Sequence, residues 1–158
     1  MSENYNTLTG FYKGWDNYQE LLTKAIAPLS PAQLDLDVAP HLRPIGVIVA
    51  HIIAARVWWF HFVMGEGSKD LEPMLSWDDD GQPARTAAEL VSGLEVTWQL
   101  IQDALARWTP ADLDQTFQRR DELFSRQWIV WHLIEHDLHH GGELSYSLGI
   151  HGLAAPEL

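Results

Sequence analysis

The 158-residue chain contains no cysteine. This absence excludes disulfide bonds, thiolate metal ligands, iron–sulfur clusters and a cysteine nucleophile. Any reactive thiol must therefore arrive with a substrate or a cofactor.

Basic residues are also scarce. Ten Lys and Arg residues stand against 22 Asp and Glu residues, which gives a formal net charge of −12. A surface with this charge repels phosphate backbones and anionic lipids. We therefore expect no binding to nucleic acid and none to a membrane surface.

The chain lacks an uninterrupted apolar run. The longest apolar stretch, residues 45–64, is broken by His51, Arg56 and His61, and ionisable side chains are rare within membrane spans. Residues 1–10 are polar and lack the basic start and apolar stretch of a signal peptide. We expect no membrane span and a cytoplasmic location. The length suits one domain over residues 1–158.

Alternation of apolar and polar residues with a period of two is absent, whereas helical spacing is frequent. Thr86 with Glu89 is a capping-box signature, Ser125 is an N-cap signal for the last helix, and Gly149 is expected to end that helix. The pattern predicts an all-α four-helix bundle without strands. Its helices are expected over residues 5–27, 45–64, 86–108 and 126–148.

A long acidic loop, residues 66–85, is expected between the second and third helices. Three apolar residues within it, Met74, Leu75 and Trp77, predict that it packs back onto the bundle. Its acidic residues are interpreted as a solvated surface.

Eight histidines and eight tryptophans stand out, and four of the histidines lie within residues 132–140 of the last predicted helix. His136 and His140 are four residues apart, so they lie one turn apart on one helix face. Two imidazoles at this spacing can bind one divalent ion. His132 extends the same stripe, whereas His139 points about 60° away from it.

A helix supplies only two good ligands to one ion, so a third must come from elsewhere. We assign it to His51, which lies in the most apolar helix, where an imidazole without a partner costs about 1–3 kcal/mol. Three nitrogen ligands leave a fourth position for water or substrate, as in catalytic sites. Trp58 and Trp59 are candidates for the wall of a nearby pocket. Metal binding needs neutral imidazoles, so we expect it to weaken as the pH falls through about 6.5.

Other interpretations of the histidines stay open. A histidine pair at helical spacing also arises in a hydrogen-bonded polar stripe. Residues 132–136 fit the inverted zincin pattern H-x-x-E-H, and residues 136–140 approach the zincin pattern H-E-x-x-H with Asp137 in place of glutamate. We assign no site to the histidines near segment ends: His41, His61 and His151.

Two motifs occur together in this chain. The first is a histidine in an apolar run that ends in tryptophan, here residues 46–59 with His51. The second has the form W-x-L-x-E-H-D-x-x-H-x-G-E-L and covers residues 131–144. Together with the closing residues 148–150, they resemble the DinB-like family of small metal-binding four-helix proteins over essentially the whole chain.

The resemblance implies an up-down-down-up bundle with a divalent metal ion, zinc or nickel among others, held by His51, His136 and His140. Characterised relatives are thiol-dependent transferases or isomerases. The resemblance therefore implies a metal-dependent thiol S-transferase-like enzyme whose partners are a small-molecule thiol and an electrophilic substrate. It also implies a homodimer, in keeping with the many large apolar residues.

Two other functions stay open. A metal-dependent hydrolase would use bound water, with Glu135 or Glu143 as its general base. A non-enzymatic, metal-stabilised bundle would bind an apolar ligand or partner. Many members of the family have Gln where this chain has Glu143, so Glu143 is either a hydrogen-bond acceptor for a histidine or a titrating group.

Overall fold

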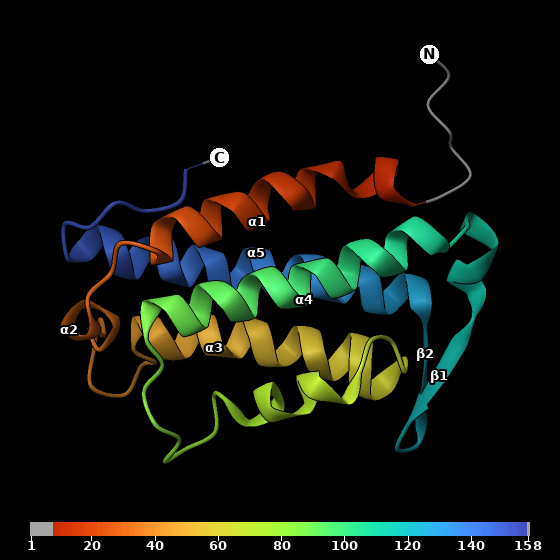
Figure 1. Cartoon of the computed structure of the whole chain (residues 1–158), viewed down its shortest axis with the longest axis horizontal. Helices are drawn as coiled ribbons and strands as arrows, with labels where there is room; N and C mark the ends of the chain where they lie inside the picture. Colours follow the sequence, from red (N-terminus) through yellow and green to blue (C-terminus); the bar gives the residue numbers. More distant parts are fainter. Residues whose placement is uncertain (1–7, 158) are drawn as a thin grey trace.

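The computed structural model describes residues 8–157 and is mostly helical, as the sequence predicts (Figure 1). Its four long helices are α1 (Lys13–Ile26), α3 (Ile45–Arg56), α4 (Ala87–Arg107) and α5 (Arg126–Ile150). The π-helical segment η2 (Val57–Val63) continues α3 without a break. The short helical segment η1 (Thr9–Tyr12) precedes α1, and three more lie between the long helices: α2 (Pro31–Leu34), η3 (Lys69–Ser76) and η4 (Pro110–Asp114).

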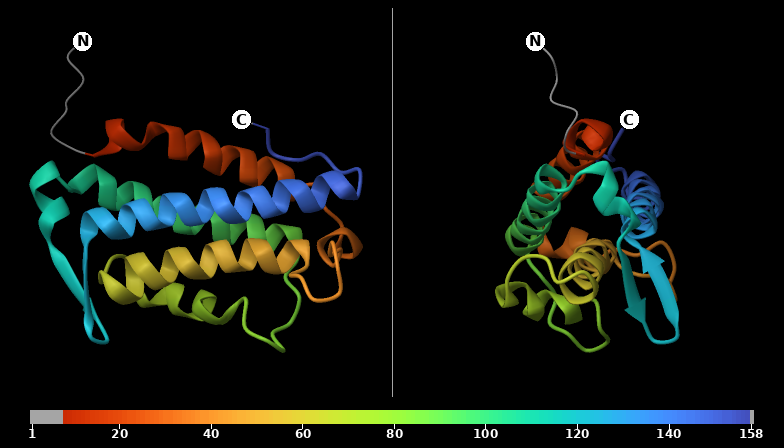
Figure 2. Two further views of the ribbon diagram at one scale, coloured as in Figure 1. Left: turned by 180° about the vertical axis from the view of Figure 1, so that it is seen from behind. Right: turned by 90° about the vertical axis from the view of Figure 1, so that its right-hand side faces the viewer.

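The four long helices lie side by side (Figures 1 and 2). The colours of Figure 1 show that α1 and α5 run toward one end of the molecule, and α3 and α4 toward the other. The apolar helix α3 packs against both α4 and α5, which explains why apolar residues occur on all of its sides. Residues Ile45–Val63 are long and apolar enough to cross a membrane, yet 61% of that window is buried inside the protein. Burial of this kind is typical of a core helix.

Local capping positions the helix ends. The side chains of Thr86 and Glu89 form the predicted capping box at the start of α4, and Ser125 accepts a hydrogen bond from the Trp128 N–H at the start of α5. The predicted end of α5 was wrong. Gly149 remains helical, and the helix ends at Ile150, followed by Gly152 with a φ of 67°. Glycine tolerates that left-handed conformation, so the chain turns there.

The prediction of a chain without strands was also wrong. Thr116–Arg119 (β1) and Glu122–Ser125 (β2) form an antiparallel hairpin, with Phe117 opposite Phe124. Each strand has four residues, which is too short for alternation to stand out. The turn carries Arg120 at a φ of 53°, a conformation in which glycine or asparagine would have marked a hairpin in the sequence.

The connections contain more helix than predicted. Helix α2 lies between the first two predicted helices, and Ser30 caps it together with Gln33. The acidic loop contains η3, whose Leu71 is buried. The prediction that this loop packs back was correct, because Met74, Leu75 and Trp77 contact the buried core. In the first helix, a 3-10 turn over Thr9–Tyr12 precedes α1, and residues 5–7 of the prediction lie outside the described part.

Candidate metal centre

His51 of α3 meets His136 and His140 of α5. The ring centroids of the three imidazoles lie 4.3 to 4.9 Å apart. One nitrogen from each ring lies within 4.8 Å of the others. The three residues that the sequence singled out are therefore brought together. No other part of the described chain contributes a histidine to this cluster.

Carboxylates hold two of the imidazoles. His51 Nδ1 lies 2.6 Å from Asp78 Oδ2, and His140 Nδ1 lies 2.8 Å from Glu143 Oε2. A carboxylate accepts a hydrogen bond, so each Nδ1 carries the proton and donates it. The Nε2 atom of each neutral ring is then left with a lone pair. Glu143 is therefore a hydrogen-bond acceptor for a histidine, one of the two roles that the sequence left open.

The third imidazole has no carboxylate partner within residues 8–157. His136 Nε2 lies 3.1 Å from His51 Nε2, while its Nδ1 is buried and has no hydrogen-bond partner among the described residues. Burial, followed by the nearby imidazoles of His140 and His51, lowers the pKa of His136 from 6.5 to about 3. Burial also lowers the pKa of His140. Both rings therefore stay neutral near pH 7, the state that binds a metal ion.

Asp78 is the site residue that sequence reasoning missed. It lies in the acidic loop that was interpreted as a solvated surface, yet its side chain is largely buried, with only 19% of it exposed. Burial acts to raise the pKa of Asp78, but the hydrogen bond from His51 and the charge of Arg43 lower it more. Asp78 is therefore ionised. The only indication of Asp78 in the sequence was its position next to Trp77, whose side chain packs against the core.

The other histidines do not belong to the three-histidine cluster, although the rings of His139 and His132 lie 4.8 Å from His140 and 6.0 Å from His136 between centroids. His132 stacks on Trp128, with ring centroids 4.7 Å apart, and its Nδ1 lies 3.4 Å from the carboxylate of Glu135. Glu135 therefore faces His132, and the structure gives it no contact with the three-histidine cluster. His139 is exposed and lies beside Glu143. The remaining rings contact main-chain oxygens or lie exposed: His61, His151 and His41.

Two cavities border the cluster through its carboxylates. A cavity of about 590 Å³ between α2, the start of α3 and residues 77–86 includes Asp78 in its wall. A cavity of about 310 Å³ over α3 and α5 includes Glu143. Trp58 and Trp59 line neither of them. Trp58 instead stacks on Phe62, and Trp59 is buried.

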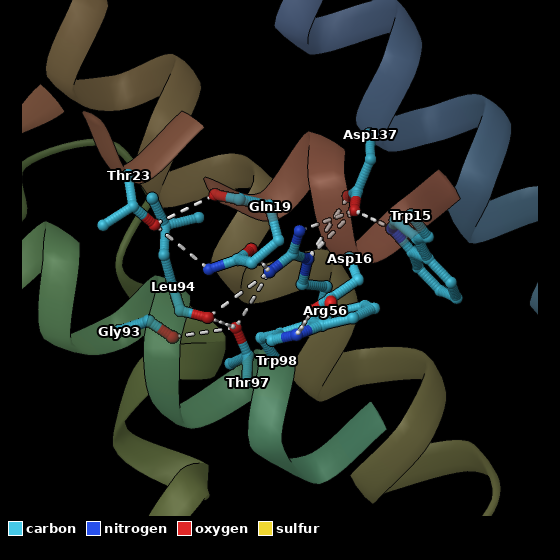
Figure 3. A network of polar contacts seen from close by, with 10 residues as sticks. All are labelled: Trp15, Asp16, Gln19, Thr23, Arg56, Gly93, Leu94, Thr97, Trp98 and Asp137. Carbon is cyan, nitrogen blue, oxygen red and sulfur yellow. Dashed lines mark hydrogen bonds and ion pairs between the residues drawn. The ribbon is translucent and has the colours of Figure 1, made fainter. Parts of the chain in front are cut away.

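A buried ion pair involves the residue that follows His136 in the sequence (Figure 3). Asp137, the residue after His136, contacts Arg56 at 2.6 Å, and both side chains are fully buried. Arg56 also donates to Gln19 of α1 at 2.7 Å, and Trp15 of α1 donates to Asp137 at 2.7 Å. A contact to Thr97 of α4 completes a network that joins all four long helices. In the sequence, Arg56 stood out only as an interruption of an apolar run.

Solved structures with the same fold come from several bacteria. A DinB-like protein from Bacillus cereus is 22% identical, with a TM-score of 0.77 over 98% of this chain and 99% of that chain. A conserved protein from Enterococcus faecalis is 14% identical, with a TM-score of 0.69 over 89% and 95% of the two chains. A DinB-like protein from Bacillus subtilis is 14% identical, with a TM-score of 0.58 over 96% and 94%. At these identities the likeness shows the fold alone.

Sequence comparison reaches the same family. No curated protein matches the chain. The sequence profile of the DinB superfamily matches residues 14–144, which contain all three histidines and both carboxylates of the cluster. The chain therefore belongs to the DinB superfamily.

Proposed function

We propose that His51, His136 and His140 bind one divalent cation, with zinc or nickel as the first candidates. The observation that carries this proposal is the pair of carboxylates at Nδ1 of His51 and of His140. They leave an Nε2 lone pair on each ring inside a cluster whose nitrogens lie within 4.8 Å of one another. Histidines that bind metals ordinarily donate their other N–H to a carboxylate or carbonyl.

The donor set fits such an ion in its chemistry. Neutral imidazole nitrogens suit zinc, nickel and copper, and Asp78 and Glu143 supply two negative charges against the two positive charges of the ion. The facing Nε2 atoms of His51 and His136 are only 3.1 Å apart. If both present lone pairs, they repel each other, and a cation between the ligands relieves that repulsion.

The activity we propose is transfer of a small-molecule thiol to an electrophilic substrate. A bound divalent metal ion would supply the means to lower the pKa of the thiol, as it does for coordinated water and thiols elsewhere. The chain has no cysteine of its own, so its residues offer no competing thiolate ligand. In the transfer, the sulfur–carbon bond forms, the leaving group departs with its electron pair, and the thiol proton passes to solvent.

The residues of the chain hold and orient this centre. Asp78 and Glu143 keep the Nδ1 protons of His51 and His140 in place, which fixes the ring orientations. His140 is buried to 8% exposure, which restricts the access of water to this ligand. The up-down-down-up order of helices and the homodimer, both implied by the family resemblance, belong to this proposal, and the chain directions in Figure 1 support the first.

Metal content of single variants tests the binding site. Replacing His51, His136 or His140 by Ala should each remove most of the metal from protein purified without a polyhistidine tag, as measured by elemental analysis. His132→Ala and His139→Ala should keep it. Full metal in His51→Ala together with loss in His132→Ala would instead support the inverted zincin pattern.

The pH dependence of metal binding is refined by the structure. The sequence led us to expect weaker binding as the pH falls through about 6.5. Because the pKa values of His136 and His140 are lowered, we expect the protein to retain its metal ion at pH values below 6.5.

An activity panel on the metal-loaded protein separates the chemical alternatives. Turnover of electrophilic substrates that requires an added thiol supports the proposed transferase. Hydrolysis without thiol would support a metal-dependent hydrolase instead. Binding of metal with neither activity would favour the non-enzymatic bundle.

A further inference from the structure

The smaller cavity beside the histidine cluster has its own set of polar groups. It measures about 310 Å³ and lies between residues 38–43, α3 and α5. Val38, Leu42 and Ile48 form its apolar wall, and Arg43, Glu143 and Ser147 are polar members of its lining. Glu143 is also the carboxylate that holds His140. The cavity and the cluster therefore share a side chain. The volume suits a small ligand, at the low end of the usual range for binding sites.

Ser147 is a buried hydroxyl without a partner. It is 1% exposed, and its Oγ makes no hydrogen bond to any described residue. An unsatisfied buried polar group costs about 1–3 kcal/mol. Because Ser147 lines the cavity, a polar ligand in that cavity can satisfy it.

Arg43 is a cation without a bonded partner. No hydrogen bond or ion pair joins its guanidinium to another residue in the described range 8–157. Its charge nevertheless helps to lower the pKa values of both Asp78 and Glu143. Arg43 also lines the same cavity as Glu143, the carboxylate that holds His140. Arginine suits the recognition of a carboxylate because its planar group forms two parallel hydrogen bonds.

The local charge favours an anionic ligand although the whole chain carries −12. The two carboxylates Asp78 and Glu143 balance the two charges of the proposed metal ion. Glu143 in addition faces the imidazoles of His139 and His140. Arg43 then remains as the one unbalanced charge among these groups.

We propose that this cavity binds the carboxylate end of the small thiol that reacts at the histidine cluster, with Arg43 as its counter-ion and Ser147 as a hydrogen-bond donor. This inference rests on the proposed function, since it assigns the chemical class of the thiol. It also predicts that a simple carboxylate binds the metal-free cavity through Arg43 and Ser147, but more weakly than in the zinc-loaded chain, because the negative charges of Asp78 and Glu143 are then not balanced.

Calorimetric titration of the zinc-loaded full chain tests the thiol class. The probes are 3-mercaptopropionate and 3-mercaptopropanol, which differ mainly in the carboxylate. The carboxylate thiol should bind at least about tenfold more tightly. Arg43→Gln should abolish this preference without changing the affinity for 3-mercaptopropanol. Ser147→Ala should weaken the binding of 3-mercaptopropionate about threefold to tenfold. The matched control is Arg120→Gln, which removes the same charge from the exposed hairpin turn and should change neither affinity.

A second measurement needs no metal. Propionate is titrated into the metal-free chain, and the backbone amide shifts of Ile48, Glu143 and Ser147 are followed by nuclear magnetic resonance. Saturable shifts that Arg43→Gln removes support the cavity assignment even if no metal binds.

Each negative result has a separate meaning. Equal affinities of the two thiols for the zinc-loaded chain overturn the inference and leave the metal site intact. Failure to bind either zinc or nickel overturns the proposed function, and the propionate titration then tests the cavity by itself. Absence of Arg43-dependent shifts overturns the cavity assignment in either case.

Discussion

At His51 and His140, a carboxylate accepts a hydrogen bond from the Nδ1 atom of the imidazole ring. This arrangement decides which nitrogen carries the proton, and it makes the other nitrogen available as a ligand. The two carboxylates reach the cluster by different routes. Glu143 lies three residues beyond His140 on the same helix, whereas Asp78 comes from a loop that follows α3 and η2.

The loop carboxylate should contribute strongly to metal affinity. We expect Asp78→Asn to weaken zinc binding about 10-fold to 100-fold, because the amide holds the proton of His51 less firmly and removes a negative charge. Competition with a chelator of known affinity measures the change. Asp79→Asn is the matched control, since Asp79 is exposed and carries the same charge. Equal effects of the two substitutions would show that only the overall charge matters.

The buried imidazole should make folding stability depend on pH. The pKa of His136 is about 3 in the folded protein, against about 6.5 in the unfolded chain. The unfolded chain therefore binds more protons between these values, and stability is lost as the pH falls from 6.5 toward 3. For the metal-free protein, urea unfolding at pH 6.5 and pH 5 should differ by about 1–2 kcal/mol from this residue. A His136→Gln variant should show a smaller difference, and an unchanged slope would contradict the assignment.

At the scale of helices, the Arg56–Asp137 pair explains how two distant elements hold the cluster. It links α3 to α5 one residue after His136, and side chains of α1 and α4 complete its hydrogen bonds (Figure 3). Along α3, one apolar cluster ends at Ile53 and the other begins at Val57. The ion pair therefore lies between the two halves of the core.

Breaking this buried pair should be costly. We expect Asp137→Asn to reduce the free energy of unfolding by about 3–5 kcal/mol, because it leaves the guanidinium of Arg56 buried without its counter-ion. Urea denaturation followed by circular dichroism measures the loss. Glu20→Gln, which breaks the exposed pair with Lys24, should have little effect. Similar losses in both variants would show that burial of the pair is unimportant.

Helices α1 and α5 approach each other closely at Gly141. A Cβ atom at this position would overlap the hydroxyl group of Tyr18, whereas a Cβ atom at Gly142 would meet no neighbour within 4 Å. We expect Gly141→Ala to destabilise the fold by about 1–3 kcal/mol through overpacking. Gly142→Ala should be neutral or stabilising, because alanine is the better helix former. Thermal unfolding of the two variants provides the comparison, and equal melting temperatures would contradict it.

At the scale of the whole molecule, several large apolar side chains remain on the surface. Phe62, Leu123 and Trp131 are each more than 60% exposed. Apolar groups left on a surface in this way are typical of association sites when they are contiguous.

The homodimer expected from the family resemblance stays a prediction. Light scattering at micromolar concentration should give about twice the chain mass of 18.0 kDa. A mass of one chain would contradict it, and the exposed aromatic residues would then need another explanation.

The sequence by itself determined the features that depend on neighbours within one or two helical turns. Apolar spacing identified the four long helices, and capping side chains placed the starts of α4 and α5. The four-residue separation of His136 and His140 placed both on one face of α5. His51 was found because an imidazole in an apolar helix needs a partner.

Only the tertiary structure decided the contacts between residues far apart in the chain. Asp78 approaches His51 across 27 residues, and Arg56 meets Asp137 across 81 residues. The hairpin depends on two strands too short to show a pattern. In each case the partner is selected by how helices and loops pack, and side-chain periodicity carries no information about that packing. The sequence therefore located the three imidazoles, whereas the fold supplied the groups that orient them.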